Sequence, residues 1–170
     1  MKIAIEAQRI FRPNKHGMDF VALETIRELQ KRNDGNQYYV IVAPGEDRCL
    51  ENSANLSIIE VKYPTYPLWE QIGLPQAIKR LGVDLLHCTS NTAPLWCPVP
   101  LVLTLHDIIY LEPRQHRSPS LYQEMGWFYR RLVVPHIIKK CKKIITVSHF
   151  ECNCIQQALK IPVDQITTVY

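Results

Sequence analysis

Short apolar runs alternate with segments of helical period along the whole chain. Apolar runs of roughly four to eight residues, bounded by turn residues, are typical of buried strands. The runs lie at residues 2–7, 37–44, 56–61, 84–88, 99–106, 142–147 and 165–170. Segments with helical spacing or helix-capping residues lie at 18–33, 75–81, 120–140 and 148–160. Alternating strands and helices form βαβ units. The pattern therefore predicts an α/β fold: a Rossmann-like, doubly wound, mainly parallel sheet with helices on both faces.

Individual residues mark where these helices begin or bend. Ser148 and Glu151 have the spacing of a capping box at the start of the last helix. Pro135 is expected to kink or divide the helix at residues 120–140, because proline lacks a backbone N–H. Three prolines punctuate residues 62–75, and no helix or strand is predicted within residues 62–74. No repeat or linker divides the sequence, so residues 1–170 are expected to form one domain.

Composition and charge limit the class of protein further. The chain has 170 residues, 46% hydrophobic and 21% charged, which suits a globular domain with a sizeable core. The net charge of +4 permits anionic partners but does not indicate nucleic acid. The first residues are too short and polar for a signal sequence, so the six cysteines are expected to be free thiols of a cytoplasmic protein. No apolar run reaches the ~18–20 residues that a membrane span needs.

Three polar stretches follow predicted strands or precede a predicted helix. They are the loop that ends at Gly17, the turn HCTSNTAP after residues 84–88, and the pair His106 and Asp107 at the end of residues 99–106. In doubly wound sheets, ligands bind at the carboxyl ends of the strands. A buried imidazole beside a carboxylate costs free energy unless both are hydrogen-bonded. The sequence therefore points to a site at this edge of the sheet.

Several spaced motifs resemble the N-terminal half of family 4 glycosyltransferases. They are KHGMDF, DLLHCTSNTAPLWCPVPLVLTLHDIIYLEP and KKIITVSHFECNCI followed by ITTVY. The resemblance implies the GT-B fold and retaining transfer of a hexosyl group, mannosyl included, from a nucleotide-sugar to a glycan or lipid-linked acceptor, as in polysaccharide biosynthesis. It implies no cofactor and no metal. It also implies a C-terminal donor-binding domain beyond Tyr170, without which the chain alone is expected to be inactive.

The resemblance assigns roles to two residues at the end of the strand at residues 99–106. It implies that His106 is a catalytic residue that faces the cleft between the two domains and contacts the donor sugar. A neutral imidazole can orient a hydroxyl through one donor and one acceptor. The alternative is a histidine bonded to a loop carbonyl. Asp107 is a candidate for binding an acceptor hydroxyl, although capping of the following turn is the favoured role.

Further candidates lie in the two neighbouring loops. Gly17 precedes a helix, whose N-terminus favours a phosphate, and its missing Cβ allows a close approach. Asp19 stands where the family often has a second glycine, and its charge is expected to repel phosphate, so a plain turn glycine is the alternative. Ser90 and Asn91 are candidates for an acceptor hydroxyl, with turn formation as the alternative.

A basic amphipathic segment, YRRLVVPHIIKKCKK, is the last candidate. It is either a solvated helix face or a patch for anionic lipid at the inner face of the membrane. Its charged residues are Arg130, Arg131, Lys139, Lys140, Lys142 and Lys143. Two other readings of the whole chain remain open: a non-catalytic binding module with the same fold, and an unrelated flavodoxin-like nucleotide-binding domain.

Overall fold

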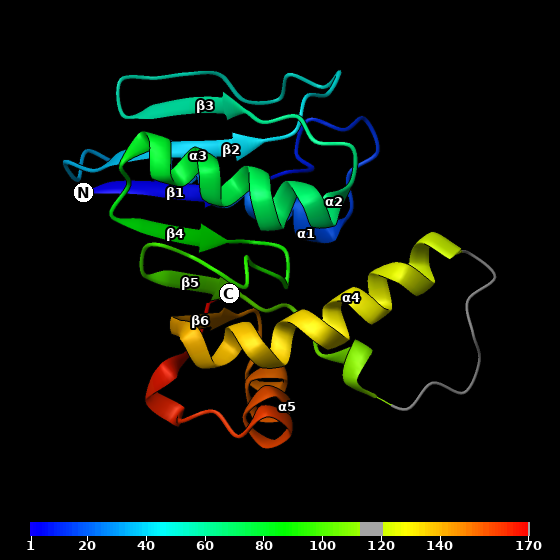
Figure 1. The fold of residues 1–170 in the computed structure, drawn as a ribbon. Helices are drawn as coiled ribbons and strands as arrows, with labels where there is room; N and C mark the ends of the chain where they lie inside the picture. The colour runs from blue at the N-terminus through cyan, green and yellow to red at the C-terminus, as the bar shows by residue number, and fades with distance from the viewer. Residues whose placement is uncertain (113–120, 170) are drawn as a thin grey trace.

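A single parallel sheet of seven strands forms the centre of the protein (Figure 1). The computed structural model describes residues 1–112 and 121–169. The strands are β1 (Lys2–Glu6), β2 (Gln37–Val42), β3 (Leu56–Glu60), β4 (Leu85–Cys88), β5 (Leu101–Thr104), β6 (Cys141–Thr146) and β7 (Ile166–Thr168). Their order across the sheet is β3-β2-β1-β4-β5-β6-β7, and every neighbouring pair is parallel. All seven predicted strands are present, and the α/β prediction is confirmed.

Helices cover both faces of this sheet. They are α1 (Gly17–Gln30), α2 (Tyr66–Leu68), α3 (Leu74–Leu81), α4 (Leu121–Ile137) and α5 (His149–Leu159). A π-helical turn at Trp69–Gly73 joins α2 to α3, and short 3₁₀ turns lie at Ile109–Leu111, Ile138–Lys140 and Val163–Gln165. In Figure 1, α3 and α4 lie on the near side of the strands. The prediction of helices on both faces therefore holds.

Two buried clusters, one on each face, hold the helices to the sheet. Ala4 belongs to the cluster that includes α3 and α4, whereas Ile5 belongs to the cluster that includes α1. Successive residues of a strand point to opposite faces. Because β1 is covered on both sides, its sequence is a continuous apolar run rather than an alternating one.

The segment before α3 differs from the prediction. Residues 66–81 are helical almost without interruption, through α2, the π-helical turn and α3. Pro67 lies in the first turn of its helix, where no N–H bond is lost, so this proline does not exclude a helix. Trp69 is fully buried and its indole N–H donates to the Val61 carbonyl at 2.8 Å. The buried tryptophan therefore lies in a helical segment, residues 66–81, that the prolines had led us not to predict.

Two helix-end predictions have different outcomes. Ser148 Oγ accepts a hydrogen bond from the Glu151 N–H at 3.1 Å, so Ser148 caps α5 as predicted. Pro135 does not divide α4, which continues through it to Ile137. A proline this close to the end removes one bond from the last turn only. All six cysteines are free thiols, and none of the described helices has the length and apolar character needed to cross a membrane.

Candidate functional site

The site lies where the strand order reverses. From β1 the chain continues to β2 on one side of the sheet and later to β4 on the other. The carboxyl ends of the strands beside such a switch point flank a crevice, which is where doubly wound folds bind ligands. The loops after β1, β4 and β5 leave the sheet at this edge. These loops and the first residue of α1, Gly17, carry all five residues that the sequence proposed for the site.

His106 lies two residues beyond β5 and is half-buried. Its backbone N–H donates to Asn91 Oδ1 at 2.6 Å, and its ring Nε2 lies 2.9 Å from the Thr89 carbonyl oxygen. A carbonyl can only accept, so Nε2 carries a proton in this geometry. In the neutral form of the ring Nδ1 is then an acceptor, and no described residue bonds to it. The bond to a loop carbonyl, given above as the alternative role, is present, and it leaves Nδ1 able to accept a hydrogen bond from a hydroxyl.

Asn91 is part of the loop that supports His106. Its backbone is in the left-handed region, with φ 64°, and its side chain is only 3% exposed. Its N–H donates to the Thr104 carbonyl at 3.2 Å, while its side-chain oxygen accepts from His106. Asparagine tolerates this conformation better than most residues. The geometry thus favours turn formation over direct contact with an acceptor.

Ser90 and Asp107 also make local contacts. Ser90 lies near the buried Glu6 carboxyl and acts to lower its pKa. Asp107 Oδ1 accepts from the Ile109 N–H at 3.3 Å, which caps the turn after the strand. No hydrogen bond joins the side chains of His106 and Asp107 in the described part of the chain. The bond of Asp107 is the turn capping that the sequence favoured.

The N-terminus of α1 carries more positive charge than the sequence suggested. Gly17 is exposed, and a Cβ placed on it would meet nothing within 4 Å. Asp19 is 3% exposed and accepts from the His16 N–H at 2.8 Å. Its oxygens also face Arg12 Nη2 at 2.5 Å and Arg9 Nε at 3.4 Å. Two guanidinium groups therefore face its single charge, which offsets the repulsion of a phosphate that we expected from the sequence.

Glu6, at the end of β1, is a site residue that the sequence analysis missed. It is fully buried and accepts from the N–H groups of Gln8 at 3.0 Å and Thr89 at 3.2 Å. Burial raises the pKa of its carboxyl above 4.5, and the bonds from Gln8 and Thr89 act in the opposite direction. A glutamate that ends a buried apolar run is the signal that would have found it.

Glu70, in the π-helical turn, is a second buried carboxyl that the sequence analysis missed. Hydroxyl groups of Tyr66 and Thr92 meet its Oε1 at 2.7 and 2.5 Å. Tyr129 of α4 donates to Oε2 at 2.5 Å, and Gln71 does so at 3.1 Å. Burial raises the pKa of Glu70 to about 7. No sequence pattern marks this cluster, because its members come from three separate segments.

Comparison with known proteins identifies the family. The sequence profile of Glycosyltransferase Family 4 matches residues 16–170. This chain belongs to glycosyltransferase family 4. A search of curated proteins finds no match to the sequence.

Solved structures support the fold of this family 4 domain. The HepE protein of Anabaena, solved with UDP-glucose, is 15% identical with a TM-score of 0.58, over 100% of this chain and 43% of that one. A glycosyltransferase from Rickettsia africae is 17% identical with a TM-score of 0.55, over 99% of this chain and 42% of that one. The family 4 domain thus spans less than half the length of these structures. Its architecture is that of a Rossmann-like half of a GT-B fold.

The basic segment of the family 4 domain does not form one continuous surface. Lys140 Nζ donates to the Leu95 carbonyl at 2.6 Å, whereas Lys143 Nζ donates to the Asp164 carbonyl at 2.8 Å. Arg131 stacks 5.0 Å over the Trp127 ring of its own helix. These side chains therefore reach toward different elements. Lys139 and Lys142 are exposed, and Arg130 is half-buried.

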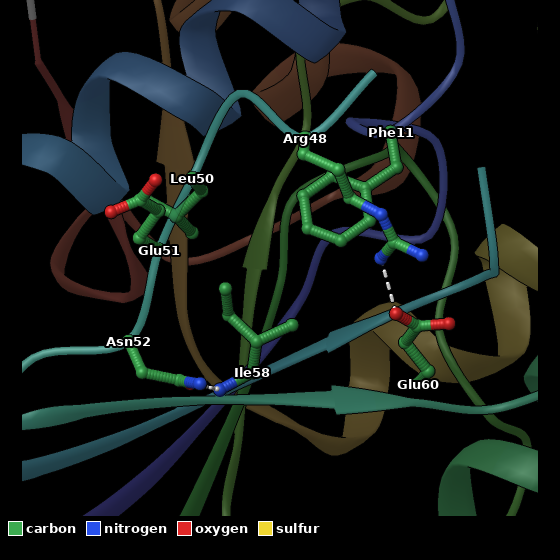
Figure 2. A pocket seen from close by; sticks show the side chains of 7 residues that line it. All are labelled: Phe11, Arg48, Leu50, Glu51, Asn52, Ile58 and Glu60. Carbon is green, nitrogen blue, oxygen red and sulfur yellow. Dashed lines mark hydrogen bonds and ion pairs between the residues drawn. The ribbon is translucent and has the colours of Figure 1, made fainter. Parts of the chain in front are cut away.

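A cavity of about 300 Å³ lies away from the switch point, beside the outer strand β3 (Figure 2). Arg48 lies 5.1 Å over the Phe11 ring and forms an ion pair with Glu60. The other lining residues are Leu50, Glu51, Asn52 and Ile58. None of the proposed site residues lines this cavity. Within residues 1–112 and 121–169, no group of three or more His, Cys, Asp or Glu side chains is placed to hold a metal.

Proposed function

We propose that this chain is the acceptor-side domain of a retaining glycosyltransferase that moves a hexosyl group, such as mannosyl, from a nucleotide-sugar to a glycan or lipid-linked acceptor. The observation that carries the proposal is His106, with its Nδ1 able to accept at the carboxyl edge of a family 4 domain. The HepE protein, of the same fold, was solved with UDP-glucose. A nucleotide-sugar is therefore the donor class that we assign here.

Within this proposal, each group at the edge has a limited task. His106 Nδ1 accepts a hydrogen bond from a hydroxyl group of the donor sugar and so orients the sugar ring while the glycosidic bond breaks. The first N–H groups of α1, beside exposed Gly17, stabilise the negative charge of the leaving diphosphate. The second domain supplies most of the contacts to the nucleotide. No residue of this chain needs to act as a base.

Two measurements test the proposal. Calorimetry of residues 1–170 with a panel of nucleotide-sugars is expected to show weak or no binding, because the second domain is missing, and micromolar binding would contradict the two-domain division. In a protein that continues into that domain, His106→Ala is expected to lower kcat about tenfold or more, which corresponds to roughly 1.4 kcal/mol of transition-state stabilisation. Normal turnover in that variant would show that His106 is a structural histidine and contradict its role in transfer.

We also propose that the domain contacts an anionic membrane where lipid-linked acceptors reside. Three side chains at helical spacing on α4 are exposed and apolar: Met125 (68%), Phe128 (55%) and Leu132 (67%). Arg130 and Arg131 lie on the same helix. Apolar residues beside cations are the pattern that binds at a lipid interface. This helix supports the contact better than the lysines at residues 139–143, whose side chains reach toward different elements.

Vesicle co-sedimentation tests the membrane contact. Replacing Phe128 and Leu132 by glutamine is expected to lower binding to anionic vesicles, and added salt is expected to weaken the remainder. Phe20→Gln is a matched control, since Phe20 is 52% exposed on α1 instead. Neutral substitutions at four lysines measure how much of the vesicle binding depends on the basic segment. They are Lys139, Lys140, Lys142 and Lys143. Equal sedimentation of all variants would contradict the membrane contact and indicate that this helix face is only solvated surface.

A further inference from the structure

The loop that holds His106 is itself held by two buried carboxyls. Glu6 accepts from the Thr89 N–H, and the Thr89 hydroxyl donates to the Glu6 carbonyl at 2.7 Å. At the other end of the loop, Thr92 bonds to Glu70. Between these ends, the loop offers His106 its two acceptors, the Thr89 carbonyl and the Asn91 side chain. Any movement of residues 89–92 therefore moves the ring of His106.

Counting protons in the Glu70 cluster shows which form of the carboxyl fits. Three oxygens make three mutual contacts: Tyr66 to Glu70 at 2.7 Å, Tyr66 to Thr92 at 2.7 Å and Thr92 to Glu70 at 2.5 Å. Each contact needs one proton, and the two hydroxyls supply only two. A carboxylate would leave two lone pairs facing each other across one contact. A neutral Glu70 carboxylic acid supplies the third proton and completes the ring.

The other titratable groups around Glu70 do not favour its ionised form. Tyr66 is on the same helical segment, Tyr129 comes from α4, Cys88 from β4 and Glu6 from β1. Burial raises the pKa of both tyrosines and of the Cys88 thiol, so these three groups stay protonated near neutral pH. Glu6 disfavours a second negative charge nearby. The hydrogen-bonded hydroxyls oppose these effects but do not outweigh burial.

We infer that Glu70 is a positioning residue whose neutral carboxylic acid fixes the loop at residues 89–92 and thereby the ring of His106. Ionisation of Glu70 removes one proton from the ring of three oxygens, which separates Thr92 from Tyr66 and loosens the loop. The role in catalysis rests on the proposed function, because it acts through His106. The proton linkage itself does not, since it is a property of this chain alone.

The direction of the pH effect follows from the sign of the shift. A carboxyl whose pKa rises from 4.5 to about 7 in the closed loop binds its proton more tightly there than in an open, hydrated loop. The closed form of the loop at residues 89–92 is therefore most stable below about pH 4.5, and its stability falls as pH rises toward 7. If the ionisation of Glu70 is fully coupled to opening of the loop, the equilibrium constant for opening increases about tenfold per pH unit between pH 4.5 and 7 and levels off above pH 7.

Hydrogen exchange of the His106 backbone amide measures the opening directly, because this N–H donates to Asn91. In the unmodified chain, protection is expected to fall about tenfold per pH unit between pH 5 and 7 and to level off above pH 7. Glu70→Gln retains a donor and an acceptor at every pH, so its protection is expected to be flat. Identical profiles would overturn the inference.

Two further measurements keep the result unambiguous. Glu6→Gln is the matched control, a second buried carboxyl at the same loop, and is expected to retain the fall in protection. If Glu70→Gln does not fold, carbon-13 NMR of the Glu70 carboxyl in the unmodified chain gives the answer: titration near pH 7 supports the inference, and titration near 4.5 overturns it. Neither measurement involves a sugar, so the proposed function can fail while the linkage holds.

Discussion

Replacing Asn91 separates two contributions to the stability of the His106 loop. Asn91→Gly removes the side-chain acceptor but keeps a residue that adopts φ 64° without strain. The His106 N–H then loses its partner at 2.6 Å, which is expected to cost about 1–2 kcal/mol of unfolding free energy. Asn91→Ala loses the same bond and also forces a Cβ-bearing residue into the left-handed region, for about 1–2 kcal/mol more. The alanine variant should therefore be the less stable of the two.

Urea denaturation, followed by tryptophan fluorescence, is a suitable assay because Trp69 is fully buried. The two variants should have lower midpoints, in the order stated, with unchanged slopes. Asn14→Ala, in an exposed loop, is a control and should stay within about 0.5 kcal/mol of the unmodified chain. If Asn91→Gly and Asn91→Ala both left stability unchanged, the reasoning would be refuted, and the side chain would be available for an acceptor after all.

Two other predictions concern glycines and pH. Gly17→Ala should leave the thermal midpoint nearly unchanged, because the added Cβ meets nothing within 4 Å. Gly45→Ala places a Cβ 2.2 Å from the Phe11 carbonyl oxygen and should lower the unfolding free energy by about 1–3 kcal/mol. Equal midpoints for the two variants would contradict this. The raised pKa of Glu70 should lower the unfolding free energy by about 3 kcal/mol as pH rises from 4.5 to about 7, since each pH unit contributes about 1.4 kcal/mol. Urea titrations of Glu70→Gln should lack that loss, and parallel curves for the two proteins would contradict the assignment.

The parts of the fold that the sequence predicts are those determined by local pattern. Each strand is a short apolar run, and burial on both faces makes such runs continuous, so β1 to β7 are recognisable one by one. The position of His106 follows from the same logic, because the end of a strand is visible in the sequence. The helix before α3 is not predictable in this way. Its prolines indicate a break, and only the burial of Trp69 against Val61 reveals that the chain stays helical.

The polar cluster around Glu70 is unpredictable for a different reason. Thr92 and Tyr129 are 22 and 59 residues away from Glu70 in the sequence. No spacing rule connects them, because their proximity depends on how α4 packs beside the loop after β4. The bond of His106 to the Thr89 carbonyl is also a product of the assembled loop. Sequence patterns locate strand ends, whereas contacts among loops require the tertiary structure.

The place of β1 in the middle of the sheet has a consequence for the order in which the protein acquires its structure. β1 pairs with β2, which follows soon in the sequence, and with β4, which begins only at Leu85. A nascent chain that has reached β3 can complete three strands and α1, but it leaves one side of β1 with unpaired N–H and C=O groups. Such an open edge invites pairing with other chains. This edge of β1 stays unpaired until residues 61–88 have been synthesised and have folded. Variants that slow the formation of α3 or β4 should therefore aggregate during synthesis, even when the finished domain is stable.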